Sequence, residues 1–164
     1  MKNDYEVRAQ KFIRQIFPYL EGCRNDHSDR EYAVWTFNRD HNRKVMYEHG
    51  MTRYALITAD YVVKVDYACT RWGNSEDEME LYEEAVQDGF EYLFAKISRY
   101  LYQGMAFYIM PRIHGIGSKF YDADEYMTAS EVNWCCDHGL CDLHNQNYGW
   151  QDGHVVIFDY AARY

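Results

Sequence analysis

Three oxygen-bearing side chains near the end of the chain could do chemistry together. Asp142 and Asn147 lie five positions apart in a polar loop, and Asp159 follows the apolar run from His154 to Phe158. Carboxylate and amide oxygens are ligands that Mg²⁺ accepts, and a carboxylate can also orient or deprotonate a hydroxyl. Phosphoryl transfer needs both functions, because in that reaction the protein contributes mainly positioning and charge. The alternative is a polar turn that carries a surface Asp and a surface Asn.

The sequence pattern of this region resembles that of the protein-kinase-like superfamily. Residues 141–147 contain the D-L-x-x-x-N part of the kinase catalytic loop, and residues 155–161 read V-V-I-F-D-Y-A where the family has a strand that ends in D-F-G. The combination of D-L-H-x-x-N-x-G with V-I-x-D-Y is most similar to short kinase-like proteins of tailed phages and bacteria. The resemblance covers about residues 44 to 164, which would be about the first half of a kinase domain.

The resemblance implies a role for each of these residues and for one lysine. Asp142 would be the catalytic base or the group that orients the substrate hydroxyl, while Asn147 and Asp159 would bind Mg²⁺. Lys64 ends the run Y-V-V-K at the place of the family's V-A-I-K, and would hold the α and β phosphates of ATP. A lysine at a solvent-facing strand position is the alternative for Lys64.

The helix that follows would supply the ion-pair partner of Lys64. Glu78 and Glu80 are both candidates, and the pattern N-x-x-x-E-x-x-x-Y favours Glu78. Ser75 and Glu78 also have the spacing of a capping box, in which Glu78 would only cap the helix.

The other residues expected to contact the nucleotide are assigned from their place in the order of elements that kinases have. Gly50 would lie in the loop that covers the phosphates, although G-x-G-x-x-G is absent and a plain hairpin turn is the alternative. Met110 and Ile113 would belong to the connector that meets adenine. Directly before Asp142, where the family has H-R, the sequence has Leu140 and Cys141. D-Y-A also replaces D-F-G, and the chain ends at Tyr164 without an activation segment. Regulation through that segment is therefore not expected.

The elements that must position these residues can be predicted from periodicity. Helical spacing of apolar residues predicts a helix between Asp4 and Glu21, and a long helix that starts after Asn74 and runs to Ile97. A further helix is expected within residues 124–137. Strands are expected at the following residues: 32–37, 44–48, 53–58, 61–67, 106–110 and 154–158.

This order predicts an α+β chain with a minimal protein-kinase-like fold. An antiparallel sheet and one long helix would form the N-lobe, and a much reduced helical part would form the C-lobe. We expect a single domain over residues 1–164, with a helical extension at 1–30, the strand-rich N-lobe at 31–110, and the C-lobe with the catalytic loop at 111–164.

Composition limits the other function classes. The net charge is −9, from 26 acidic and 17 basic residues, so binding to nucleic acid is not expected. The charged start of the chain and the absence of an apolar run of about 20 residues predict a protein without a signal peptide or membrane span, located in the cytoplasm. Thiol and imidazole side chains that could bind a structural zinc ion are crowded near the end of the chain, namely Cys135, Cys136, His138, Cys141 and His144. Their spacing does not match paired C-x-x-C ligands, so buried thiols are the simpler interpretation.

Two functions follow from the resemblance. The first is an ATP- and Mg²⁺-dependent phosphotransferase that acts on a host protein, in the host cytoplasm if a phage encodes it. The second is a pseudokinase, a catalytically degenerate kinase-like binding module. It would inhibit a host or defence protein by binding it and blocking it sterically. Retention of Asp142, Asn147 and Asp159 favours the enzyme. The oligomeric state and the substrate do not follow from the sequence.

Overall fold

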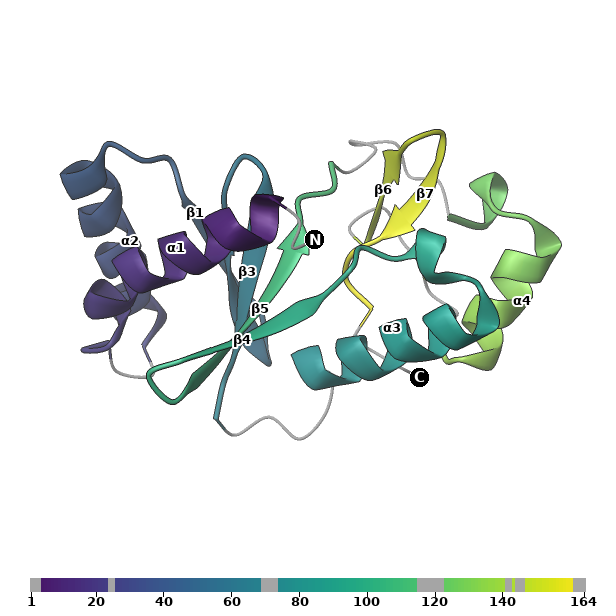
Figure 1. The fold of residues 1–164 in the computed structure, drawn as a ribbon, viewed down its shortest axis with the longest axis horizontal. Helices are drawn as coiled ribbons and strands as arrows, with labels where there is room; N and C mark the ends of the chain where they lie inside the picture. The colour runs from purple at the N-terminus through teal and green to yellow at the C-terminus, as the bar shows by residue number, and fades with distance from the viewer. Residues whose placement is uncertain are drawn as a thin grey trace. The chain divides into compact units, whose positions relative to one another are not determined.

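The chain has an α+β fold, which the computed structural model describes for residues 4–23, 26–68, 74–114, 123–140, 143 and 147–160. Two compact units divide the chain, and both are discontinuous in sequence (Figure 1). The first unit comprises residues 1–68 and 98–112, and the second comprises residues 69–97 and 113–164.

A five-stranded antiparallel sheet forms the centre of the first unit. Its strand order is β1-β2-β3-β5-β4. The strands have these bounds: β1 Met46–His49, β2 Arg53–Ile57, β3 Tyr61–Asp66, β4 Ser98–Tyr102 and β5 Met105–Pro111. A tight turn joins β2 to β3, where the Thr58 backbone N–H donates to the carbonyl of Tyr61 at 3.0 Å. The predicted antiparallel sheet is therefore confirmed.

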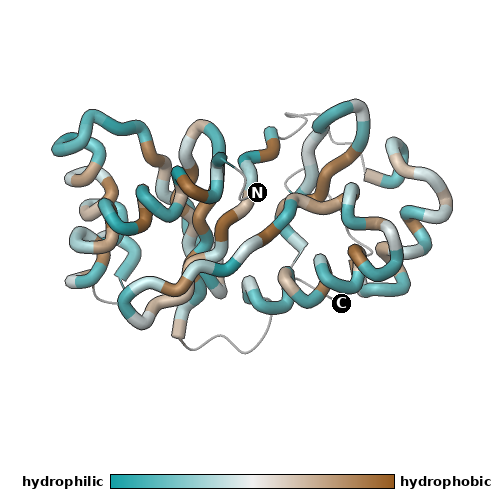
Figure 2. Tube along the Cα trace, in the orientation of Figure 1, coloured by the Kyte–Doolittle hydropathy of each residue, from teal (hydrophilic) through white to brown (hydrophobic). Residues whose placement is uncertain are grey.

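Two helices, α1 (Asp4–Leu20) and α2 (His27–His41), build the core of the first unit. α1 contacts α2, β3 and β5, and its buried apolar residues are Ala9, Phe12, Ile13, Ile16, Phe17 and Leu20. Phe12 packs edge to face on Phe37 of α2, with ring centroids 5.6 Å apart. Figure 2 shows hydrophobic and hydrophilic positions alternating along these elements, as expected for a helix or strand with one buried face.

The predicted strand at residues 32–37 is wrong, because this segment lies inside α2. Its buried residues are Arg30, Ala33, Val34 and Phe37, which recur at the helical spacing i, i+3, i+4 and i+7. Asp26 caps the helix by accepting the backbone N–H of Ser28, and Asn42 ends it in the left-handed conformation. These two caps lie outside the β-branched and aromatic residues that suggested a strand.

The second unit contains α3 (Ser75–Asp88), two short 3₁₀ turns at Glu91–Leu93 and Ala123–Tyr126, α4 (Ala129–Asp137), and a hairpin of β6 (Tyr148–Gln151) and β7 (His154–Ile157). A turn at Asp152 and Gly153 joins the two hairpin strands, and both residues have positive φ. In the part of the chain that the structure describes, no helix is both long and apolar enough to span a membrane.

The predicted long helix is too long. α3 stops at Asp88, because Gly89 adopts the left-handed conformation with φ of 80° and its N–H returns to the carbonyl of Ala85. Residues 98–102, for which no helix or strand was predicted, form β4. The helix predicted within residues 124–137 is present as a 3₁₀ turn followed by α4.

Candidate functional site

The strand end that carries Asp159 is tied to α3 by a buried carboxylate. Glu78 has no exposed surface, and its Oε1 accepts the backbone N–H of Tyr160 at 3.1 Å. A buried hydrogen bond is costly to break, because either group left without its partner is also cut off from water. The residue directly after Asp159 is therefore held to the first turn of the helix that was predicted to contribute to the site.

Glu78 does not cap α3, so the capping-box alternative is wrong. Asn74 is the N-cap, and its side chain accepts the N–H of Asp77 at 3.1 Å while the Asp77 carboxylate accepts the N–H of Asn74 at 3.1 Å. The box lies one residue earlier than the predicted pair of Ser75 and Glu78. Glu78 is consequently left to face the interior, whereas Glu80 is exposed.

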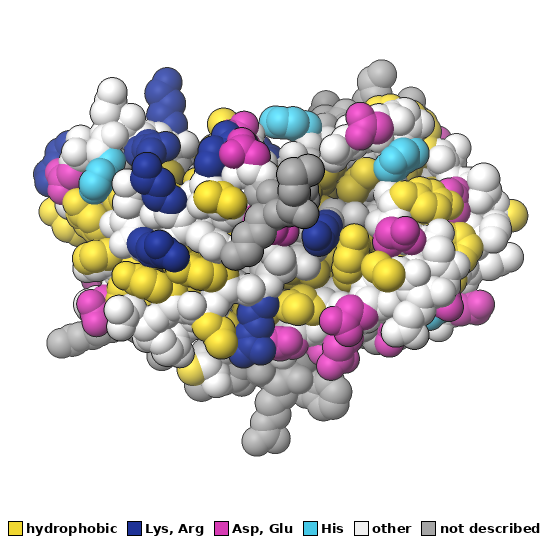
Figure 3. Space-filling view, in the orientation of Figure 1, with side chains coloured by type: hydrophobic (Ala, Val, Ile, Leu, Met, Phe, Trp, Pro, Cys, Tyr) yellow, Lys and Arg dark blue, Asp and Glu magenta, His cyan; other side chains and the backbone are white. Residues whose placement is uncertain are grey.

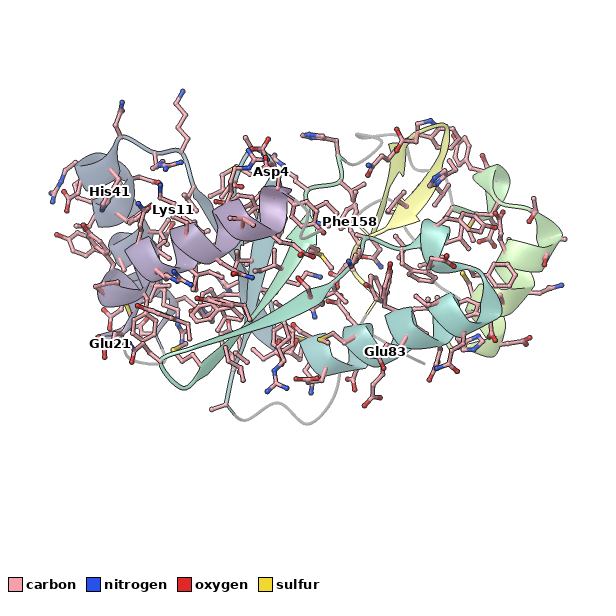
Figure 4. All side chains as sticks on the ribbon, viewed as in Figure 1. Asp4, Lys11, Glu21, His41, Glu83 and Phe158 are labelled. Atoms are coloured by element: carbon pink, nitrogen blue, oxygen red, sulfur yellow. The ribbon has the colours of Figure 1, made fainter. Side chains whose placement is uncertain are left out.

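Asn147 lies beside the same strand end. Its backbone carbonyl accepts the N–H of Phe158 at 2.8 Å and the N–H of Asp159 at 3.3 Å. The structure thus brings together the backbones of the two residues predicted to bind metal. Asp159 itself is exposed, and Figure 4 labels its neighbour Phe158 where the chain leaves β7.

Tyr160 fixes the position of Asp159 more firmly than the sequence indicated. Its side chain is fully buried, and its hydroxyl donates to the carbonyl of Ala95 at 2.8 Å. Its ring packs edge to face on Phe94 at 5.0 Å. The adjacent Ala95 N–H donates to the carbonyl of Ile157 at 2.8 Å. The sequence shows Tyr160 as a departure from D-F-G and as a large amphipathic side chain directly after a strand, and the second feature is the one that predicts packing.

Ile113 is held against the hairpin of the second unit. A Cβ atom at Gly149 would lie 2.6 Å from the Ile113 Cγ2 and 2.2 Å from the His114 carbonyl oxygen. Only glycine fits here, because a backbone atom cannot move aside as a flexible side chain can. The residues after β5 and the strand β6 are therefore in direct backbone contact.

The first unit carries Lys64, Met110 and Gly50. Lys64 pairs with Tyr108 across β3 and β5, and Met110 pairs with Val62, so these side chains share one face of the sheet. The neighbours of Lys64 in β3, Val63 and Val65, belong to the core against the helices, so Lys64 and Met110 point to the opposite face. Lys64 is only 6% exposed, so the solvent-facing alternative is wrong.

Gly50 lies in the turn between β1 and β2. It is exposed, and its N–H donates to the carbonyl of Arg53 at 2.8 Å, as in a hairpin turn. A role in covering phosphates stays a prediction.

The predicted catalytic Asp142 lies outside the described residues, as do Cys141 and His144. Its neighbour Leu143 is 6% exposed, and its carbonyl accepts the N–H of Ala123 at 3.2 Å. Cys135 is buried and Cys136 is exposed, so the two adjacent thiols point in different directions. Among the residues with a described placement, no group of three or more His, Cys, Asp and Glu side chains could hold a metal ion.

Charge is divided unequally between the two units. The first has 13 Lys and Arg against 10 Asp and Glu, a net charge of +3, whereas the second has 4 against 16, a net charge of −12. On the face drawn in Figure 3, Lys and Arg side chains gather over the first unit. The predicted metal ligands thus lie in the acidic unit, where a divalent cation is favoured, and the predicted phosphate-binding lysine lies in the basic unit.

No protein-family model matches the sequence, and no curated protein shows significant similarity to it.

Proposed function

We propose that this protein is an ATP- and Mg²⁺-dependent phosphotransferase of the protein-kinase-like type. The observation that carries the proposal is the hydrogen bond from the Tyr160 N–H to the buried Glu78, directly after Asp159. A fully buried carboxylate is costly unless it has partners, and such groups gather at functional sites. Here the carboxylate belongs to the helix predicted to bear the ion-pair glutamate, and it holds the strand end predicted to bear the metal ligand.

The order of elements supports the same proposal. Helix α3 lies between β3 and β4 in the chain, and the sheet order is β1-β2-β3-β5-β4. The resemblance predicts strands, a long helix, a strand before the connector, a second helix and a final strand, and these correspond to β1 to β3, α3, β5, α4 and β7, whereas β4 and β6 were not expected.

The residues fit Mg²⁺ and ATP in chemical type. Asp159 and Asn147 would offer carboxylate and amide oxygens to Mg²⁺, and Lys64, a buried cation, would pair with the phosphates of ATP. ATP supplies the phosphoryl group, and Asp142 would orient or deprotonate the acceptor hydroxyl. The substrate that we propose is a host protein, as the resemblance to phage kinase-like proteins implies.

Phosphate transfer tests the proposal directly. We expect that the purified protein with Mg²⁺ and γ-labelled ATP labels a protein in a host lysate, and that Asp142→Ala abolishes this labelling. Asp137→Ala, which alters an exposed residue at the end of α4, is the matched control and should retain it. Absence of labelling by the unmodified protein, or equal labelling by Asp142→Ala, would contradict the enzyme.

The charge distribution favours one second candidate, a kinase-like binding module that acts by occupation. A unit with net charge −12 attracts basic partners whether or not phosphate is transferred. In that case Asp142→Ala would still act on the host target as the unmodified protein does. The residues of the kinase-like site would then have no catalytic role.

A further inference from the structure

A surface groove runs along one side of α3. It is lined by Met79, Tyr82, Glu83, Val86, Gln87 and Ile97. Every one of these residues belongs to the second unit, and Figure 4 labels Glu83 on α3. None of them is among the predicted catalytic or nucleotide-binding residues.

The groove is formed by a second apolar stripe on α3. The buried stripe of this helix consists of Ser75, Glu78, Leu81 and Ala85. Met79, Tyr82 and Val86 follow one another at the spacing i, i+3 and i+7, so they form a separate stripe beside it. Val86 is 49% exposed, although it is apolar. The helix therefore presents more apolar surface than its packing uses, which is typical of a docking face.

The charges around the groove select its occupant. Seven of the 14 residues of α3 are Asp or Glu, and none is Lys or Arg. Glu83 lines the groove and is exposed, as is the nearby Glu80. Such a rim repels nucleic acid and the acidic second unit of another copy of this chain, and it attracts Lys and Arg.

We propose that this groove binds a basic segment of a partner protein. An apolar side chain of the segment would fill the groove over Tyr82 and Val86, and flanking Lys or Arg side chains would pair with Glu80 and Glu83. The inference goes beyond the proposed function, because it needs neither nucleotide nor metal. Salt should weaken the complex, since exposed charge pairs are screened while the apolar contact is not.

Two pairs of matched variants test the location. Val86→Arg fills the groove and adds a positive charge, and Val7→Arg adds the same charge at an equally exposed valine of α1. Glu83→Lys reverses a charge at the rim, and Glu31→Lys makes the same reversal at an exposed glutamate of α2. All four positions lie on helix surfaces, so circular dichroism should show an unchanged fold.

The probe is a fluorescein-labelled synthetic peptide of about 15 residues, with Lys throughout and Leu at helical spacing. A second peptide replaces each Leu with Ser, and binding is measured by fluorescence anisotropy without nucleotide. We expect the Leu peptide to bind at least about tenfold more tightly than the Ser peptide, and Val86→Arg and Glu83→Lys to weaken it about tenfold. The control variants should change its affinity less than about twofold.

Three results would overturn the inference. These are no binding of the Leu peptide at low salt, equal binding of the Leu and Ser peptides, or equal weakening in the groove variants and their controls. Since the assay contains no ATP, its outcome is separate from that of the phosphate-transfer experiment.

Discussion

The two units of this protein are stabilised by different means. In the first, helices α1 and α2 cover a five-stranded sheet with a large apolar and aromatic core. In the second, shorter elements surround fully buried polar groups, Ser75 and Glu78, and the net charge is −12. Apolar packing is tolerant of substitution by similar side chains, whereas a buried carboxylate needs specific partners.

This difference indicates where function is concentrated. A protein that buries an ionisable group loses stability there, and such groups gather at functional sites. In the first unit, the charged side chains of Glu6, Arg30 and Lys64 are buried but keep 6 to 8% of their surface exposed. In the second unit Glu78 has no exposed surface, and it accepts the backbone N–H of the residue that follows Asp159. Substitutions in each unit should reveal the contrast.

The largest loss of stability is expected for Phe37→Ala in the first unit. Phe37 is fully buried and packs edge to face on Phe12 and Tyr19, at 5.6 and 5.4 Å. Removal of the ring should lower the free energy of unfolding by about 3 to 5 kcal/mol, measured by urea denaturation. The exposed Tyr32→Ala on the same helix is the control and should cost less than about 1 kcal/mol. Equal effects of the two changes would contradict the packing of α2 as a core helix.

A somewhat smaller loss is expected for Gly149→Ala in the second unit. The new Cβ would lie 2.2 Å from the His114 carbonyl oxygen, so β6 must separate from the residues after β5. Overpacking of this kind should cost about 2 to 3 kcal/mol. Gly22→Ala, where a Cβ meets nothing within 4 Å, should change stability by less than about 0.5 kcal/mol. Hydrogen exchange should locate the loss of protection in β6 and β7, and a loss confined to the first unit would refute the close contact.

The contrast between buried and exposed carboxylates is tested by Glu78→Ala. The change removes the acceptor of the Tyr160 N–H, and a buried donor left without a partner should cost about 2 kcal/mol. Glu80→Ala, on an exposed position of the same helix, should cost less than about 0.5 kcal/mol. If the two variants unfold at the same urea concentration, the tie between α3 and the strand end is not stabilising.

The smallest effect is a pH dependence at the start of α4. Burial alone would raise the pKa of Glu131, but hydrogen bonds from Thr128 and Tyr92 outweigh it and lower the pKa below its usual 4.5. The stabilisation is therefore complete above pH 4.5 and is lost as the pH falls through the lowered pKa. Glu131→Gln should lower stability at neutral pH by about 1 kcal/mol or less, a typical size for a helix cap.

Thermal unfolding from pH 7 to pH 3 checks this dependence. The difference between the unmodified protein and Glu131→Gln should shrink as the solution becomes more acidic, whereas Glu125→Gln, at an exposed position, should behave like the unmodified protein throughout. A difference that grows on acidification would contradict the sign.

Strong local signals allowed most of the sheet to be predicted from the sequence. The bounds of β2, β3 and β7 agree with the expected runs to within a few residues, because β-branched residues and clear turns mark them. The strand expected in α2 failed because aromatic residues suit both states, and the apolar period over residues 30–37 is helical. β4 was missed because its exposed and half-buried residues have no apolar run.

The candidate site was predictable in part. Motif spacing pointed to Asn147 and Asp159, and their backbones are adjacent in the structure. The role of Glu78 as a buried acceptor depends on a contact 82 positions along the chain, which no local pattern encodes. The correct cap, Asn74 with Asp77, differs from the expected one by a single residue, which is within the usual uncertainty of helix ends.

Binding of Mg²⁺ and ATP by the strand end at Asp159 is the most direct test of the central proposal. A ligand that binds only the folded protein raises its melting temperature with concentration, by an amount equivalent to about 2.7 kcal/mol at a hundred times the dissociation constant. We predict a concentration-dependent rise for the unmodified protein and for the control Asp137→Asn, and no rise for a folded Asp159→Asn. No rise in the unmodified protein, or an equal rise in Asp159→Asn, would contradict the proposed site.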